Sequence, residues 1–106
     1  MNKACHTMAN GEILNAGHLE YPLFEGVLYG DKTRTAKLSK RLSCAIRHLP
    51  LRIRFTYEYN TLKALEKGIA KDPTFILDGK IFLEGLIDSE EITKKFEQLL
   101  KERNVT

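Results

Sequence analysis

The sequence predicts an α/β fold in which strands and helices follow one another as β-α-β-α-β-β-α around a four-stranded mixed sheet. Apolar residues recur at every second position in some segments and at every third or fourth position in others, as they do in strands and helices respectively. Asp78-Gly79 joins two short apolar runs and favours the two-residue turn of a β-hairpin. A β-α-β unit makes its strands parallel and the hairpin makes the last two antiparallel, so we expect a mixed sheet with helices on both faces.

The 106 residues are enough for one domain with one core. We expect that domain to span residues 23–106 and to follow an N-terminal arm, residues 1–22. Asn10, Gly11 and Gly17 interrupt any helix in the arm. We therefore expect the arm to be partly flexible and at most to dock a short strand or turn on the domain.

The first strand and the first helix have clear signals. Residues 23–29 are almost wholly apolar, which is typical of a central strand covered on both faces. A helix is predicted over residues 33–48, and Pro50 ends it, because the residue before a proline avoids the helical region. The helix has one apolar stripe, formed by Leu38, Leu42, Ala45, Ile46 and Leu49.

The next strand is predicted over residues 51–58, where apolar and polar side chains alternate. Its polar face carries Arg52 and Arg54. Cationic side chains discourage pairing between sheet edges, so the sequence favours an edge strand here.

A short second helix is predicted over residues 61–67. Asn60 can cap its start, and Gly68 stops it. We expect Leu62 and Leu65 to face inward.

The C-terminal part contains the hairpin and a last helix. Pro73 stands just before the first hairpin strand, where its missing N–H removes no central ladder bond. Asp88 and Glu91 form a capping-box pattern for the last helix. That helix is expected to bury Ile92, Phe96, Leu99 and Leu100.

Taken in this order, the landmarks resemble a small thioredoxin-like protein, close to the short glutaredoxin-like members. The resemblance covers residues 24–100, and its matched features are Tyr29-Gly30, Gly68-Ile69, Asp72-Pro73-Thr74, Asp78-Gly79 and Gly85. It implies that the proline is cis and faces the place of the family's C-x-x-C motif. Lys32 and Thr35 occupy the two cysteine positions in this chain. Thiol–disulfide exchange needs a thiolate and a second thiol, so the resemblance implies the fold and the groove without the redox chemistry.

The resemblance also implies where a partner would bind. An extended segment of a protein or peptide would pair its main chain beside the proline. The predicted groove residues come from two loops: Asp31, Lys32, Thr33, Arg34, Thr35, Asp72, Pro73 and Thr74. We therefore expect a redox-inactive binding or assembly module that needs no cofactor. The opposing interpretation is a groove that has lost its ligand.

Cys44 supports a competing hypothesis, an oxidoreductase that acts through this thiol or through a partner's thiol. The residue lies off the apolar stripe beside Lys40 and Arg47, which would lower the pKa of an exposed thiol. An incidental surface cysteine is the simpler interpretation. A bond to Cys5 is open in principle, but the N-terminus lacks the apolar core of a secretory signal. We therefore expect a cytoplasmic protein, in which thiols stay reduced.

Charge and spacing limit the remaining classes of function. Residues 32–54 contain eight basic side chains and no acidic one, which can attract phosphate or nucleic acid. No aromatic platform for bases accompanies them, so we expect a solvated basic face and no nucleic-acid partner. Cys5, His6, His18 and His48 match no zinc spacing, so we expect no metal. No apolar run approaches the ~20 residues that span a membrane.

Overall fold

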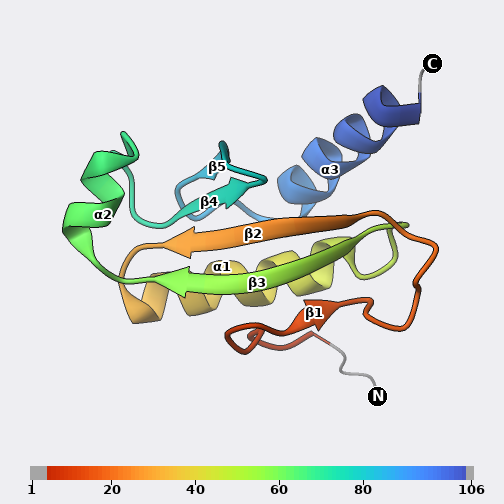
Figure 1. Ribbon diagram of the computed structural model, residues 1–106, viewed down its shortest axis with the longest axis horizontal. Helices are drawn as coiled ribbons and strands as arrows, with labels where there is room; N and C mark the ends of the chain where they lie inside the picture. Colours follow the sequence, from red (N-terminus) through yellow and green to blue (C-terminus); the bar gives the residue numbers. More distant parts are fainter. Residues whose placement is uncertain (1–4, 105–106) are drawn as a thin grey trace.

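The structure, a computed structural model, describes residues 5–104, and this part of the chain forms one five-stranded mixed sheet and three helices (Figure 1). The α/β class is confirmed, and the sheet has one strand more than predicted. The strands are β1 (Ile13–Leu14), β2 (Leu23–Tyr29), β3 (Arg52–Glu58), β4 (Thr74–Leu77) and β5 (Lys80–Glu84). The helices are α1 (Lys32–Ile46), α2 (Thr61–Glu66) and α3 (Ser89–Asn104).

The strand order across the sheet is β1-β3-β2-β4-β5. The β2 and β3 strands are parallel, and α1 connects them. The β4 and β5 strands run antiparallel to their neighbours. Asp78 and Gly79, at the hairpin turn, have φ values of 48° and 84°, the left-handed conformation that a two-residue hairpin turn requires. These features agree with the sequence signals for the β-α-β unit and the hairpin.

The prediction that β3 lies at the sheet edge is wrong, because the N-terminal arm supplies it with a neighbour. The β1 strand pairs with it antiparallel. Just before β1, two further backbone bonds join the arm to β3. The Phe55 N–H donates to the Glu12 carbonyl, and the Gly11 N–H donates to the Phe55 carbonyl. The N–H of Tyr57 donates to the side chain of Asn10. The arm therefore covers the backbone groups that β3 would otherwise expose.

The arm segment before this pairing lies against α1, and we call residues 5–9 the strap. Met8 is its anchor, with a side chain that is 2% exposed and belongs to the main hydrophobic core. The Met8 N–H donates to the Ser39 hydroxyl at 2.8 Å. The Tyr57 hydroxyl donates to the Met8 carbonyl and is also hydrogen-bonded to Ser39. Ser39 is fully buried at the border of the apolar stripe of α1.

The first residue of the strap is covalently fixed to α1 by a disulfide between Cys5 and Cys44. This corrects the interpretation of Cys44 as an incidental surface thiol and the expectation that both thiols stay free. Both side chains are half-buried.

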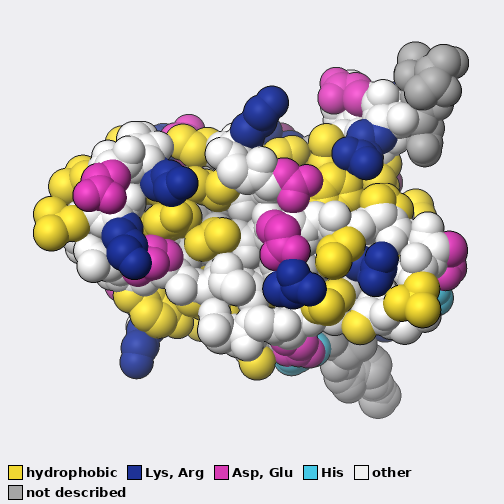
Figure 2. Space-filling view, in the orientation of Figure 1, with side chains coloured by type: hydrophobic (Ala, Val, Ile, Leu, Met, Phe, Trp, Pro, Cys, Tyr) yellow, Lys and Arg dark blue, Asp and Glu magenta, His cyan; other side chains and the backbone are white. Residues whose placement is uncertain are grey.

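The main core lies on the face of the sheet that α1 and α3 cover together. From the predicted helix stripes, Leu38, Leu42, Ile46, Ile92 and Phe96 are fully buried. A smaller cluster of Tyr29, Ile69 and Ile76 lies apart from this core, and Val27 and Ala64 pack against it. In Figure 1, α1 lies behind β2 and β3, and Figure 2 shows that acidic and basic side chains alternate on the face toward the viewer.

The turn after the strap provides a pH prediction. The Glu12 carboxylate accepts the Ala9 N–H at 2.7 Å and pairs with His6 at 2.9 Å. The Ala9 bond is the main cause that holds the pKa of Glu12 below its ordinary value of 4.5. Because the pKa is lower in the folded protein, this interaction is present above pH 4.5 and is lost as the pH falls through the folded value.

In an NMR titration we expect the Glu12 carboxyl carbon to titrate below pH 4.5 and the Ala9 amide to shift with the same midpoint. Glu12→Gln should remove the shift of the Ala9 amide below pH 4.5, since the variant has no carboxyl group to accept the Ala9 N–H. A Glu12 midpoint at or above 4.5 would contradict this prediction.

Candidate binding groove beside Pro73

The loop before β4 is fixed at both ends. The peptide bond between Asp72 and Pro73 is cis, as the resemblance implies. The Pro73 carbonyl accepts the N–H of Gly85 at 2.8 Å, and the Thr74 hydroxyl donates to the Lys71 carbonyl at 2.7 Å. Pro73 and Thr74 are both buried. These bonds hold the loop in place, and we call residues 71–74 the wall because they form one side of the groove.

Gly30 allows the connection between β2 and α1 to pass directly against this wall. Its φ is 144°, a backbone conformation that residues with a side chain rarely adopt. A Cβ at this position would lie 2.1 Å from Oδ1 of Asp72 and 3.2 Å from Cα of Pro73. Gly30 was predicted only as part of the Tyr29-Gly30 landmark, and the close approach has no local signal in the sequence.

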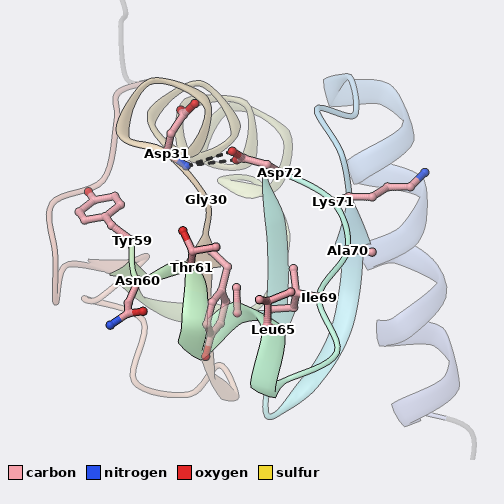
Figure 3. A pocket seen from close by; sticks show the side chains of 12 residues that line it. Gly30, Asp31, Tyr59, Asn60, Thr61, Leu65, Ile69, Ala70, Lys71 and Asp72 are labelled. Carbon is pink, nitrogen blue, oxygen red and sulfur yellow. Dashed lines mark hydrogen bonds between the residues drawn. The ribbon is translucent and has the colours of Figure 1, made fainter.

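Two carboxylates occupy the N-terminal end of α1 (Figure 3). Asp31 is the N-cap and accepts the Arg34 N–H at 2.7 Å. The Asp72 carboxylate accepts the Asp31 N–H at 3.1 Å and pairs with the Arg34 guanidinium at 3.3 Å. A helix N-terminus attracts anions, and in this protein the carboxylates of Asp31 and Asp72 occupy the position that an anion would take.

Of the eight predicted groove residues, Asp31, Arg34 and Asp72 form this connected cluster. Thr35 is buried, and its hydroxyl donates to the Asp31 carbonyl at 2.8 Å. The Lys32 ammonium lies 5.8 Å from the centre of the Tyr59 ring.

The other three predicted residues do not belong to the cluster of Asp31, Arg34 and Asp72. Thr33 is exposed on the first turn of α1, whereas Pro73 and Thr74 are buried in the wall.

A pocket of about 310 Å³ opens beside the carboxylate cluster (Figure 3). Tyr29, Leu65 and Ile69 contribute apolar surface, and Asp31 and Asp72 form an acidic edge. The two acidic residues are among the predicted groove residues, whereas the three apolar ones are not. Two of these apolar residues nevertheless had a signal in the sequence. Tyr29 lies in the predicted first strand, and Leu65 has the spacing of an inward-facing helix residue.

The prediction that Leu62 and Leu65 face inward is wrong, since their exposed fractions are 69% and 62%. The α2 helix buries no side chain. It lies beyond the ends of β2 and β3 rather than across the sheet (Figure 1). Its residue Ala64 packs against the small cluster of Tyr29, Ile69 and Ile76. Tyr59, which is 47% exposed, and Leu65 line the pocket, and Leu62 lies one turn before Leu65 on α2. We call these three residues the α2 patch.

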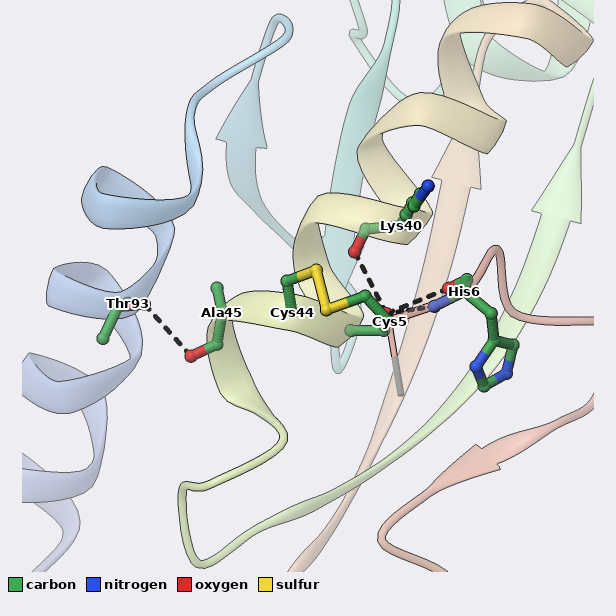
Figure 4. Close-up of a disulfide and its surroundings, with 7 residues drawn as sticks. Cys5, His6, Lys40, Cys44, Ala45 and Thr93 are labelled. Carbon is green, nitrogen blue, oxygen red and sulfur yellow. Dashed lines mark hydrogen bonds between the residues drawn. A yellow bond between two sulfur atoms is a disulfide. The ribbon is translucent and has the colours of Figure 1, made fainter. Parts of the chain in front are cut away.

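Neither cysteine contributes a thiol to the groove. Cys44 lies in the last turn of α1, whereas the groove is at the first turn, which is about 18 Å away along the axis at ~1.5 Å per residue. Its sulfur is bonded to Cys5 (Figure 4). Both cysteines of the chain are therefore paired.

The basic segment is not a uniform cationic surface. The Arg41 guanidinium donates to two backbone carbonyls before α3, and Arg52 donates to the Tyr21 carbonyl. Arg54 pairs with Glu25 on the neighbouring strand. These arginines therefore hold parts of the chain together.

Within residues 5–104, no three His, Cys, Asp or Glu side chains are grouped so that they could hold a metal ion. In the same range, no helix combines the length and apolarity needed to cross a membrane. Comparisons of the chain with protein-family models, with curated proteins and with solved structures give no match. Function is therefore inferred from the geometry of the groove.

Proposed function

We propose that this protein is a redox-inactive binding module of thioredoxin-like fold, which holds an extended segment of a partner protein in the groove beside Pro73. The observation that carries the proposal is the pocket of about 310 Å³ with the exposed α2 patch at its side. The parallel β2–β3 pair, the β4–β5 hairpin and the cis proline between them support the fold assignment. The β1 strand is an addition to that arrangement.

The size of the pocket suits side chains of a peptide better than a large cofactor. Ligand pockets span about 300–1,000 Å³, so this one lies at the lower end of the range. An extended segment could place an apolar side chain against Leu65 and Ile69 while its main chain follows residues 70–72. Apolar groups of the α2 patch would then be removed from water, which provides the driving force.

The chemistry at the start of α1 supports a role without redox activity. A thiolate is stabilised at a helix N-terminus by free N–H groups and nearby cations. Here the Asp31 N–H and the Arg34 N–H already bond to carboxylates. Negative charge next to a thiol raises its pKa, so Asp31 and Asp72 would oppose thiolate formation at the positions of Lys32 and Thr35.

The competing oxidoreductase hypothesis has one observation in its favour, the pairing of Cys5 with Cys44. An insulin-reduction assay with dithiothreitol separates the two hypotheses. A binding module should show no more activity than its Cys44→Ser variant. Activity clearly above that control would instead support an oxidoreductase.

The binding proposal predicts an effect of Leu65→Asp. A library of displayed peptides is selected on the wild-type protein, and the recovered peptides are then measured against variants. We expect Leu65→Asp to weaken binding by about tenfold or more, because burial of one leucine side chain is worth ~1.5–3 kcal/mol.

Leu19→Asp is the matched control. Leu19 is 76% exposed and does not line the pocket, so its replacement should leave peptide binding unchanged. Because both leucines are exposed, neither variant should change the thermal unfolding midpoint appreciably. Equal affinity of the recovered peptides for the wild type and Leu65→Asp would rule out this groove as their site.

A further inference from the structure

We propose that the Cys5–Cys44 disulfide locks the strap, residues 5–9, onto α1, and that reduction of this disulfide by a dithiol opens the strap. This inference concerns the opposite end of α1 from the groove and does not rest on the proposed binding function. Figure 4 shows the bond that joins the strap to the last turn of the helix.

Besides the disulfide, the strap is attached by one buried side chain and by hydrogen bonds, without any strand pairing. Between residues 5 and 9 the chain forms no strand. The His6 N–H donates to the Ser43 hydroxyl at 3.1 Å, and that hydroxyl donates to the His6 carbonyl at 2.9 Å. Met8 is the buried side chain among the five, whereas Thr7 and Ala9 are exposed. When the disulfide is broken, the strap keeps the buried Met8 side chain and the hydrogen bonds of its backbone with Ser39, Ser43 and Tyr57. It also keeps the bond from the Thr7 hydroxyl to the Ala36 carbonyl and the contacts of Ala9 and His6 with Glu12.

Opening can be confined to the strap because a turn separates it from the sheet. The Glu12 N–H donates to the Ala9 carbonyl at 3.0 Å, and Gly11 has a φ of 88°, which glycine tolerates. Beyond this turn, β1 is held by β3. The strap can leave α1 while the backbone pairing of the sheet stays intact.

The strap covers a specific polar surface. Ser39 and Ser43 have no exposed area, and the Tyr57 hydroxyl is hydrogen-bonded to the Met8 carbonyl. Opening would expose these three hydroxyl groups and the space that Met8 occupies. The reduced protein would then present a different surface along α1.

The reduction balances with a dithiol as the second reactant. A thiolate of the dithiol attacks one sulfur, for example that of Cys5, and the Cys5–Cys44 bond breaks as a mixed disulfide forms. The Cys44 sulfur leaves as a thiolate and takes up a proton. The second thiol of the reagent then attacks the mixed disulfide and releases Cys5, so two electrons and two protons pass to the protein and the dithiol becomes a disulfide. Both cysteines are half-buried, so a small thiol has a route to the bond.

Amide hydrogen exchange on the full chain tests the inference. We compare the oxidised protein, the protein reduced with dithiothreitol and the Cys5→Ser variant, following the N–H groups of His6 and Met8. We expect exchange at least about tenfold faster in the reduced protein and in Cys5→Ser, with a rate that low concentrations of urea do not change, since local opening exposes little surface.

The Phe55 amide, bonded to the Glu12 carbonyl, is the internal reference for the sheet. If the strap amides exchange at the same rate as Phe55 in the reduced protein, they exchange through unfolding of the whole fold and no separate opening exists. Unchanged strap exchange after reduction overturns the proposal as well.

A further variant and a reversal complete the test. Ser43→Ala removes the hydrogen bonds to His6 but keeps the disulfide, so its strap exchange in the oxidised state should rise less than that of Cys5→Ser. Reoxidation with glutathione disulfide should restore slow exchange in the wild type. Failure of that reversal would count against a switch.

Discussion

Reduction of the Cys5–Cys44 disulfide should lower the free energy of unfolding by about 4 kcal/mol at 25 °C. The bond joins residues 39 positions apart, and a cross-link of this span removes many conformations from the unfolded chain. Small domains have total stabilities of about 5–15 kcal/mol, so this loss is a large fraction of the total. Urea unfolding with and without dithiothreitol measures it.

Three cysteine variants serve as controls for the reduction. Cys5→Ser, Cys44→Ser and the double variant should be destabilised to a similar extent, because each lacks the same bond. Their unfolding midpoints should not change when dithiothreitol is added. The prediction is contradicted if the oxidised and reduced wild-type proteins unfold at the same urea concentration. Urea unfolding measures the stability of the whole fold, whereas amide exchange in the strap measures local opening. The predicted loss of stability and the proposed opening of the strap can therefore fail separately.

Gly30→Ala should destabilise the protein by about 2–4 kcal/mol. A residue with a side chain at a φ of 144° is strained by ~1–3 kcal/mol. The added Cβ would also lie 2.1 Å from the Asp72 carboxylate and 3.2 Å from the backbone of Pro73. Asp72 would have to give up its bond to the Asp31 N–H, so peptide affinity in the groove should fall together with stability.

Gly17→Ala is the matched substitution. No atom lies within 4 Å of a Cβ built at Gly17, and its φ is not in the left-handed region. We expect a change within about 0.5 kcal/mol, as for most surface substitutions. If Gly30→Ala and Gly17→Ala unfold at the same urea concentration, the close approach of the two loops does not contribute to stability.

Local signals predicted most of the elements. The β2 strand has the predicted bounds, and Asn60 and Asp88 cap α2 and α3 through side-chain bonds to backbone N–H groups. A cap or a hairpin turn depends on residues that are neighbours in the chain, so the sequence pattern contains the whole interaction. The α1 helix begins one residue earlier and ends two residues earlier than expected.

The arm docks a short strand, as the sequence pattern allowed, but its other contacts could not be predicted in this way because they join distant residues. Met8 stands in a segment without periodicity, and its partners Ser39 and Tyr57 are 31 and 49 positions away. Ser39 and Ser43 flank the apolar stripe of α1, and both are polar, so the sequence pattern does not show that they are buried. The strap bonds to both of their hydroxyl groups.

The candidate site was predicted in part for a similar reason. Asp31 and Asp72 follow from the landmarks of the resemblance, and the structure joins them by a hydrogen bond. Leu65 fits the spacing of an inward-facing helix residue. A six-residue helix beyond the end of the sheet has little apolar surface to face, so the residue lies at the pocket instead.

The strap also constrains the order of events during folding. Ribosomal synthesis delivers Cys5 and Met8 well before Ser39, Ser43 and Tyr57, so the arm has no docking partners until α1 and β3 have formed. Contacts between distant residues form late, because the chain must first be ordered between them. The native contacts around the Cys5–Cys44 bond are therefore complete only once the strap has docked on α1.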